Sequence, residues 1–244
     1  MTAEEIFIEK AELFSILMDI KSKKANKDAT EIAQIITNYG SNIKNIIDIM
    51  CGNGRLALEL ARRGYRVVGI DFSPFFIERA QKLARAYNLH EKTKFFVADV
   101  RCMDFFSWQE KFDVALLAWT PIGYYDYETD LEILSNIRNI VKDKGLLIIY
   151  DQIIKERIEI LPVEYFTIND YHIYASTKVS DRSLVRKWTF FKRDEKNKIK
   201  FVDEIVLKLN VYTVKDITEM IRAAGWYIER KIVKNNTLSI ICKK

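Results

Sequence analysis

The sequence predicts an α/β protein built on a doubly wound parallel sheet, with an antiparallel β segment inserted towards its end. Between residues 45 and 150, short apolar runs alternate with stretches of helical periodicity, which is typical of parallel strands joined by helices. From about Pro162 to Thr213 this alternation stops. Segments rich in aromatic and β-branched residues follow one another there, and they indicate antiparallel strands.

The composition fits one large domain, or one domain with an appendage. Hydrophobic residues make up 49% of the 244 residues, which is enough for a sizeable core. The 39 basic and 34 acidic residues are mixed along the chain and give a net charge of +5. This mixture favours a solvated surface, and we expect neither a nucleic-acid nor a membrane partner.

Cysteine usage and hydropathy predict the compartment. The three cysteines stand far apart and form no C-x-x-C motif, so we expect reduced thiols, no disulfide and no zinc site. No apolar stretch reaches membrane-spanning length, and the N-terminus lacks a signal-peptide pattern. These features together predict a cytoplasmic protein.

The first 40 residues predict two helices. Apolar residues recur at near-helical spacing between residues 3 and 20, which indicates an amphipathic helix. Residues 28–39 indicate a second helix, which ends at Gly40. The simplest role for both is to cover one side of the sheet.

The stretch 45–55 organises the parallel part of the chain. Residues 46–50 are an apolar run typical of a strand buried on both faces, and residues 51–54 are small or tolerant of unusual φ. Leucines at helical spacing follow, and a second strand at 65–70 ends at Asp71. This order is the first half of a nucleotide-binding unit, in which the N-terminus of the helix offers free N–H groups to a ligand.

The remaining elements continue this alternation and then depart from it. Ser73 and Pro74 are an N-cap and a first-turn proline that begin the next helix. The further predicted elements are strands at 94–98 and 112–118, a helix at 131–140, a strand at 146–150, antiparallel strands at 165–168, 172–179, 184–193 and 200–211, a helix at 214–224, and closing strands at 226–233 and 238–242.

Two short motifs resemble the signature of class I S-adenosylmethionine-dependent methyltransferases: Asp-Ile-Met-Cys-Gly-Asn-Gly-Arg at 48–55 and Gly-Ile-Asp-Phe-Ser at 69–73. The resemblance extends from residue 46 to about residue 150, and the last 30 or so residues fit it less specifically. It implies a Rossmann-like seven-stranded sheet of order 3-2-1-4-5-7-6 whose last strand is antiparallel. It also implies S-adenosylmethionine as cofactor and S-adenosylhomocysteine as product.

The same resemblance implies a division of the chain. Segments 41–161 and 214–244 would form the cofactor-binding domain, and the inserted antiparallel cap at 162–213 would select the substrate. Residues 1–40 would cover the cofactor cleft. Phe7 or Phe14 would then face the cofactor, and the alternative that both belong to the core stays open.

The resemblance further implies a set of cofactor-binding residues. Gly52 and Gly54 would pass close to the methionine part of the cofactor, and Asp71 would hold the ribose. Asp99 would accept a hydrogen bond from the adenine amino group, and Val100 would offer its backbone N–H to the ring. The full expected set is Asp48, Cys51, Gly52, Gly54, Arg55, Asp71, Phe72, Asp99, Val100, Ala118 and Trp119.

A dinucleotide-binding fold is the rival interpretation of these motifs. Residues 52–57 also fit G-x-G-x-x-A, and Asp71 stands at the expected distance of about 20 residues. Asp48 and Cys51 favour the methyltransferase resemblance, because that pattern has an acid near the end of the first strand and often a cysteine before the glycines. A tight turn in another α/β protein is the third interpretation.

We expect the acceptor site at the loop 119–125, because ligands of open parallel sheets lie beyond the carboxyl ends of the strands. The candidates for its wall are Trp119, Tyr124 and Tyr125, with His172 and Tyr174 from the cap. His172 is a candidate base, although a strand histidine packed beside neighbouring tyrosines explains it equally well. We therefore assign no catalytic residue. The sequence shows no clear acidic cluster, so no metal is predicted.

The leading prediction is an S-adenosylmethionine-dependent methyltransferase that acts on N or O of a small metabolite by in-line methyl transfer. The aromatic-rich cap supports a small substrate, since it would enclose a pocket. The alternatives are an RNA or protein methyltransferase, an NAD-dependent oxidoreductase, and a cofactor-binding module without catalysis. The sequence leaves the oligomeric state open, with a homodimer as one alternative.

Overall fold

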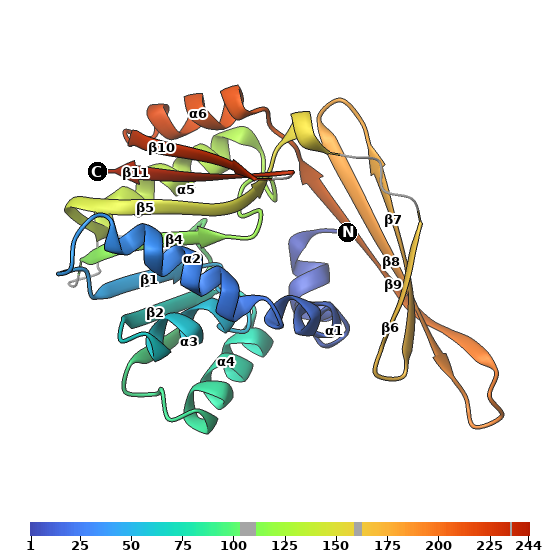
Figure 1. Cartoon of the computed structure of the whole chain (residues 1–244). Helices are drawn as coiled ribbons and strands as arrows, with labels where there is room; N and C mark the ends of the chain where they lie inside the picture. The colour runs from blue at the N-terminus through green and yellow to red at the C-terminus, as the bar shows by residue number, and fades with distance from the viewer. Residues whose placement is uncertain (103–110, 159–162, 235) are drawn as a thin grey trace.

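The computed structural model describes residues 1–102, 111–158, 163–234 and 236–244. Its main sheet has seven strands in the order β10-β11-β5-β4-β1-β2-β3 (Figure 1). Strands β1 to β5 run parallel, and β11 is antiparallel to both of its neighbours. The predicted order with an antiparallel seventh strand is therefore confirmed. The strands are β1 (Asn45–Ile49), β2 (Arg66–Asp71), β3 (Thr93–Val97), β4 (Phe112–Ala118), β5 (Val141–Ile153), β10 (Tyr227–Lys234) and β11 (Thr237–Lys243).

Helices cover both faces of this sheet, which explains the apolar runs in its central strands. In β1, Ile46 faces one helical layer, whereas Ile47 and Ile49 face the other, and all three are fully buried. One layer consists of α2 (Ala25–Thr37), α3 (Arg55–Arg62) and α4 (Pro74–Ala86). The opposite layer contains α5 (Tyr127–Ile140) and α6 (Val214–Ala223).

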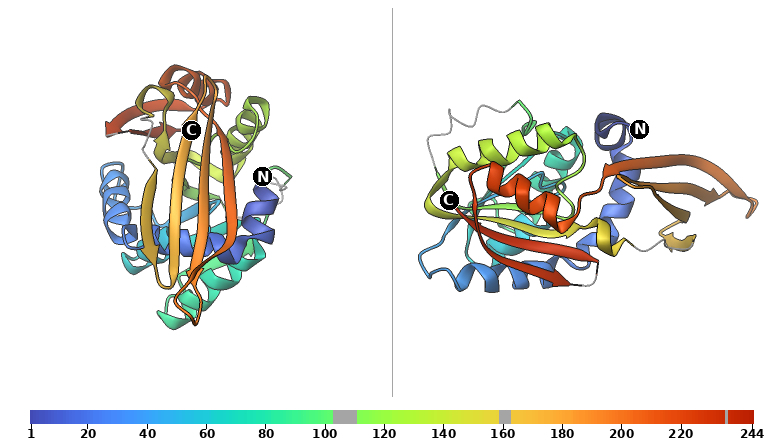
Figure 2. Two further views of the ribbon diagram at one scale, coloured as in Figure 1. Left: turned by 90° about the vertical axis from the view of Figure 1, so that its right-hand side faces the viewer. Right: turned by 90° about the horizontal axis from the view of Figure 1, so that it is seen from above.

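The predicted cap is an antiparallel sheet of four strands in the order β6-β7-β8-β9 (Figure 2). Its strands are β6 (Glu164–Ile168), β7 (Tyr171–Val179), β8 (Ser183–Arg193) and β9 (Ile199–Asn210). One end of the cap is tied to the main domain, because Asn210 N donates to Gly123 O at 2.8 Å. The expected boundary between residues 161 and 162 lies outside the described residues.

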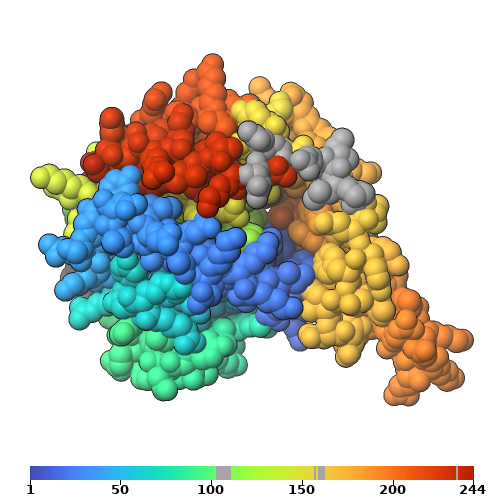
Figure 3. Space-filling model, in the orientation of Figure 1, coloured from blue at the N-terminus to red at the C-terminus, as the bar shows by residue number. Residues whose placement is uncertain are grey.

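The N-terminal segment lies between the cap and the main sheet (Figure 3). It forms η1 (Glu5–Glu9), a single π-helical turn, and α1 (Ala11–Ser22). Ile6 and Leu17 are buried against the inner face of the cap, where Phe190 is fully buried as well. We call this third apolar cluster the wedge core. It gives the cap an apolar face to pack on, since the cap shares no strand pairing with the main sheet.

Helix α5 and strand β5 are both longer than predicted. Helix α5 begins at Tyr127 and not at residue 131, because the Asp126 side chain caps it by accepting a hydrogen bond from Thr129 N at 2.8 Å. Strand β5 runs well beyond the apolar centre at 146–150, because its end pairs with β11 through Gln152 and Ile153. An apolar run marks only the doubly buried part of a strand.

Candidate active site

A cavity of about 1190 Å³ lies at the carboxyl ends of β1, β2, β4 and β5, beneath α1 and the inner face of the cap. Most of the sequence-predicted site residues meet there. The residues of that set that line it are Asp48, Cys51, Gly52, Arg55, Asp71, Phe72, Ala118, Trp119, Tyr124 and Tyr125. They come from the first glycine turn, the end of β2 and the loop after β4.

The carboxylate of Asp71 holds the glycine turn in place through hydrogen bonds to backbone N–H groups. Its Oδ2 accepts a hydrogen bond from Gly52 N at 2.8 Å, and its Oδ1 accepts one from Ser73 N at 2.9 Å. Burial raises the pKa of this carboxyl, and the two N–H donors oppose the rise. A carboxylate has about four acceptor sites, so capacity for ligand hydroxyls remains. The tether to Gly52 is a structural role that the sequence did not reveal.

The two glycines of the turn face opposite ways. Gly52 has a φ of +55° and borders the cavity, where the Met18 Cε atom lies 3.2 Å from the place a Cβ would take. Gly54 has a φ of +71° and faces inward, where a Cβ would stand 2.8 Å from Phe95 and 2.9 Å from Ala80. Gly54 does not border the cavity, so it serves the packing of α4 and β3 against the turn.

Cys51 is a small residue in a crowded place, as the sequence suggested. Its Sγ lies 2.9 Å from the place that a Cβ on Gly69 would take. Burial raises the pKa of its thiol well above the ordinary value, and the nearby Asp48 and Asp71 raise it further. A thiol held in its protonated form is a poor nucleophile.

Asp48 offers an unused acceptor. The residue is buried, and its Oδ2 atom has no hydrogen-bond partner among the described residues. Burial raises the pKa of this carboxyl to about 7, although the charge of Arg55 opposes the shift. A cationic donor in the cavity, such as an ammonium group, would satisfy this oxygen. The site therefore fits a ligand that carries a positive charge near the glycine turn.

We expect Asp48→Asn to change the pH dependence of stability. Because the pKa of Asp48 is raised from 3.8 in the folded chain, its stabilising contribution is complete below about pH 4 and is lost as the pH rises through about 7. The original chain should therefore lose stability between about pH 5 and about pH 8, whereas the variant does not lose this contribution. The free energy of unfolding of the variant minus that of the original should thus increase over this range by on the order of a few kcal/mol. Urea unfolding at both pH values measures it. Equal differences at the two values would contradict the assignment.

Trp119 brings two cations together at the end of β4. The Arg55 guanidinium lies 4.6 Å from the centroid of the Trp119 ring, and Lys21 Nζ lies 4.1 Å from it. Arg55 also forms an ion pair with Asp28 of α2, with 3.5 Å between Nη1 and Oδ2. Lys21 comes from the last turn of α1. The sequence-based prediction had placed Arg55 and Trp119 in the site, but it did not include Lys21.

The loop 119–125 is fixed by hydrogen bonds to three other elements. Gly123 N donates to Asp130 Oδ2 of α5 at 2.9 Å, and the Ile122 backbone exchanges two hydrogen bonds with the Gln152 amide of β5. Asn210 at the end of β9 donates from Nδ2 to Tyr125 O at 2.6 Å. The tyrosines of this loop therefore hold defined positions against the cavity.

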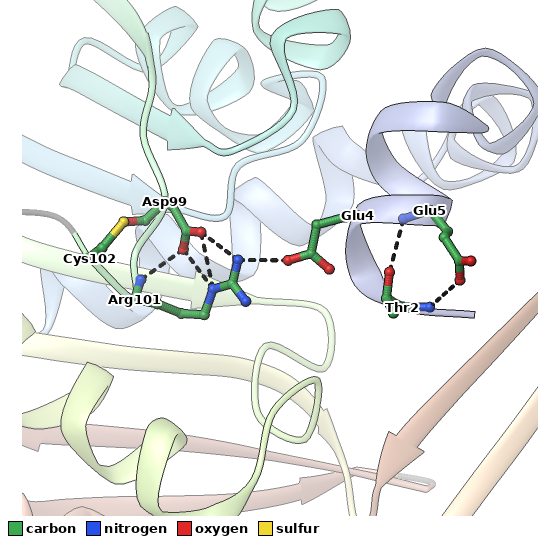
Figure 4. A network of polar contacts seen from close by, with 6 residues as sticks. All are labelled: Thr2, Glu4, Glu5, Asp99, Arg101 and Cys102. Carbon is green, nitrogen blue, oxygen red and sulfur yellow. Dashed lines mark hydrogen bonds and ion pairs between the residues drawn. The ribbon is translucent and has the colours of Figure 1, made fainter.

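The structure does not bring Asp99 and Val100 to the cavity. The Arg101 guanidinium holds both carboxylate oxygens of Asp99, and its Nη2 also contacts Glu4 Oε1 at 2.7 Å (Figure 4). This hydrogen bonding by Arg101 lowers the pKa of Asp99. The Val100 side chain is buried against α5 and the sheet. Adenine recognition by these two residues stays a prediction, and it would require Asp99 to share or release Arg101.

The structure places His172 and Tyr174 on the outer face of the cap, away from the cavity. Their neighbours Ile173 and Ala175 point inward and are fully buried. The His172 Nδ1 atom lies 2.6 Å from the Tyr165 hydroxyl, on an exposed part of the sheet. The suggestion that these two residues wall the acceptor pocket does not fit this geometry, because alternate residues of a strand face opposite sides.

Several residues of the cavity escaped the sequence-based prediction. From α1 these are Leu17, Met18 and Lys21, which share one face with Phe14, the residue that the sequence had offered as a candidate, at the i, i+3, i+4 and i+7 spacing of an amphipathic helix. From the cap, Arg186 lines the cavity, forms an ion pair with Glu164 and donates to Thr177 Oγ1 at 2.5 Å. The helical spacing of the α1 set was visible in the sequence, but nothing there indicated which face met the ligand.

Within the described ranges, no three side chains of His, Cys, Asp or Glu lie close enough together to hold a metal ion. Of the helices in the part of the chain that the structure describes, none is long and apolar enough to cross a membrane.

The sheet order, the glycine turn and the acid at the end of β2 define the fold of a class I methyltransferase, and the comparisons with known proteins agree. Residues 46–145 match the family model described as a methyltransferase domain. The chain is 26% identical over 225 residues to a protein of Geobacillus sp. (strain WCH70) that is named as a methyltransferase, with 89% of each chain covered. The chain thus carries a methyltransferase domain with the class I fold, and the comparisons support S-adenosylmethionine as its cofactor.

Solved structures share this fold over nearly the whole chain. An S-adenosylmethionine-dependent methyltransferase from Clostridium acetobutylicum ATCC 824 superimposes with a TM-score of 0.77 at 18% identity, covering 96% of this chain and 97% of the other. The sugar N-methyltransferase KedS8 from Streptoalloteichus sp. ATCC 53650 gives a TM-score of 0.80 at 14% identity, covering 95% and 92%. At these identities the likeness concerns the fold.

Proposed function

We propose that this enzyme transfers the methyl group of S-adenosylmethionine to a nitrogen or oxygen atom of a small metabolite. The observation that carries the proposal is the cavity of about 1190 Å³ between the main sheet and the cap. Ligand pockets are typically about 300–1,000 Å³, so the space suits a cofactor together with a small acceptor. The sugar N-methyltransferase KedS8, which has a similar fold, supports a small acceptor by analogy only.

The residues suggest how the cofactor would lie. Asp71 would accept from the ribose hydroxyls while it keeps its two backbone partners, and Gly52 would let the methionine part approach the backbone. The unpartnered Asp48 Oδ2 would take the methionine ammonium group. When bound, the cofactor supplies an activated methyl group on sulfur, and the protein aligns the acceptor behind it.

The cap would select the acceptor. Its inner face lines the cavity with apolar and aromatic side chains, among them Phe166, Trp188, Leu207 and Leu209. Arg186, Glu164 and Thr177 add polar groups to that face. A largely apolar wall with a few fixed polar groups is the arrangement that orients a small ligand. The expectation that the cap selects the substrate is therefore kept as part of this proposal.

The test has a binding step and a transfer step. Calorimetry should show saturable binding of S-adenosylhomocysteine and none of NAD. The enzyme is then incubated with methyl-labelled S-adenosylmethionine and separate panels of amino sugars, other amines, hydroxylated metabolites, transfer RNA and protein. We expect label in a small product. Label that appears only in precipitated RNA or protein would replace this proposal with the macromolecular alternative.

A further inference from the structure

Lys21 lines the cavity from the last turn of α1. It follows Met18, which packs over Gly52, by almost one helical turn on the same helix face. Its Nζ lies 4.1 Å from the centroid of the Trp119 ring, directly after β4, on the side of the sheet edge where the cap approaches. Lys21 is exposed as a whole residue, although burial of its amino group contributes to the pKa shift described next.

The charges around Lys21 disfavour its protonated form. Burial lowers the pKa of Lys21, and the positive charges of Lys24, Arg55 and Arg186 lower it further, to about 8. Asp151 at the end of β5 opposes this shift, and so does the Trp119 ring, which favours a cation above its face.

No carboxylate neutralises Lys21 directly. Among the described residues it has no ion-pair partner within 4.0 Å. The nearby guanidinium groups have their own carboxylates, because Arg55 pairs with Asp28 and Arg186 pairs with Glu164. Lys21 is thus a cavity-facing amine without a committed partner, in a positive field that comes from α3, the cap and the segment before α2.

We propose that Lys21 accepts the proton that the methyl acceptor loses during transfer. The inference rests on the proposed function and deepens it, since it implies an acceptor that binds in protonated form, such as an alkylammonium group, or an acidic hydroxyl. The neutral Lys21 Nζ takes the proton from the acceptor and becomes an ammonium group. The freed lone pair forms the new bond to the methyl carbon as the carbon–sulfur bond breaks, and the sulfur keeps that electron pair. Lys21 then returns its proton to solvent through the cavity.

Two carboxyl groups and two tyrosines that also line the cavity are less suited to this step. The Asp71 oxygens already hold two backbone N–H groups, and Asp48 lies buried in β1 beneath the glycine turn. Burial raises the pKa of Tyr125 to about 12 and that of Tyr124 still higher, so both keep their protons near neutral pH. Lys21 alone among these combines an open position with a pKa near the working range.

The first experiment compares two substitutions of Lys21, one that removes its charge and one that keeps a positive charge. Using the acceptor found in the panel above, Lys21→Gln and Lys21→Arg should each lower kcat by about 100-fold or more, with unchanged affinity for S-adenosylhomocysteine. The kcat of the original enzyme should rise with pH and level off above about 8, and neither variant should show this limb. Lys215→Gln, an exposed lysine on α6, is the matched control. An active Lys21→Arg enzyme would overturn the proposal, because arginine can hold an anion but cannot accept a proton.

The second experiment needs no acceptor. Lysine labelled with ¹³C at Cε is followed by NMR in the intact enzyme with S-adenosylhomocysteine, and the Lys21 signal is assigned by its loss in Lys21→Arg. We expect a titration midpoint near 8, which moves upward in Arg186→Gln. A midpoint at or above 10 would overturn the inference. If the original enzyme methylated nothing in the panel, the proposed function itself would be wrong. An active Lys21→Arg enzyme would contradict only the role of Lys21 as proton acceptor.

Discussion

Replacing Gly123 by alanine should lower the free energy of unfolding by about 2–4 kcal/mol and move the loop 119–125. Gly123 has a φ of +110°, which side chains rarely adopt, and a Cβ there would stand under 3.0 Å from the Asn210 backbone carbonyl. That carbonyl cannot move freely, because Asn210 N donates to Gly123 O and its Nδ2 donates to Tyr125 O. The clash therefore displaces either the loop or the end of the cap. Urea unfolding measures the loss, and the methyl-transfer assay measures the damage to the cavity.

Gly64→Ala is the matched control for this substitution. Gly64 has a similar φ of +100°, but no described atom lies within 4 Å of the place its Cβ would take. The control therefore carries the cost of the backbone conformation alone, on the order of 1 kcal/mol. The difference between the two variants isolates the contact with Asn210. Equal losses in both would show that the loop yields to the added methyl group.

Asp71→Ala should weaken S-adenosylhomocysteine binding by about one to two powers of ten and also lower stability. The binding loss follows from the missing hydrogen bonds to the ribose. The stability loss follows from Gly52 N and Ser73 N, which lose their partner at a cost of roughly 1–3 kcal/mol for each donor that stays buried. The strand itself should persist, since Val67 and Ile70 keep their buried packing. Calorimetry and urea unfolding on the same variant give both quantities.

Asp181→Ala serves as the control for Asp71→Ala. Its carboxylate is exposed and pairs only with Lys155 on the surface, so both quantities should stay nearly unchanged. If Asp71→Ala lowered stability while the affinity for S-adenosylhomocysteine remained intact, Asp71 would be a tether of the glycine turn and not a cofactor ligand.

The parallel half of the fold could be predicted because its strands are buried on both faces. Such strands appear as apolar runs, as at Ile46–Ile49 and in β4, and the turns between them need small residues such as Gly52. The cap could be predicted as antiparallel for a similar reason, since aromatic and β-branched residues dominate its strands. These signals are local, so they can be recognised without knowing which elements pack together.

The part of the site that could not be predicted from the sequence depends mainly on contacts between residues that are distant in the chain. His172 and Tyr174 face outward because of the register of β7, and a shift of one residue would have turned them inward. Gly54 is needed for Phe95 and Ala80, which come from other elements. The Asp99 carboxylate accepts hydrogen bonds from Arg101, two residues further on. Arg101 also donates to Glu4, which lies 97 positions earlier in the chain. Contacts of this kind leave no periodic pattern in the amino-acid sequence.

The wedge core also bears on how the enzyme is made. Residues 1–22 are synthesised before the cap, yet they pack on Phe190, Ile205 and Leu207, and Lys10 pairs with Asp203 across 193 positions. The first helix therefore lacks its neighbours in the cap until β8 and β9 have been synthesised. The Rossmann-like sheet from β1 to β5 can assemble in the meantime, because its pairings involve nearer strands. The active site can thus close only late in biosynthesis, once the long-range contacts between the first helix and the cap can form.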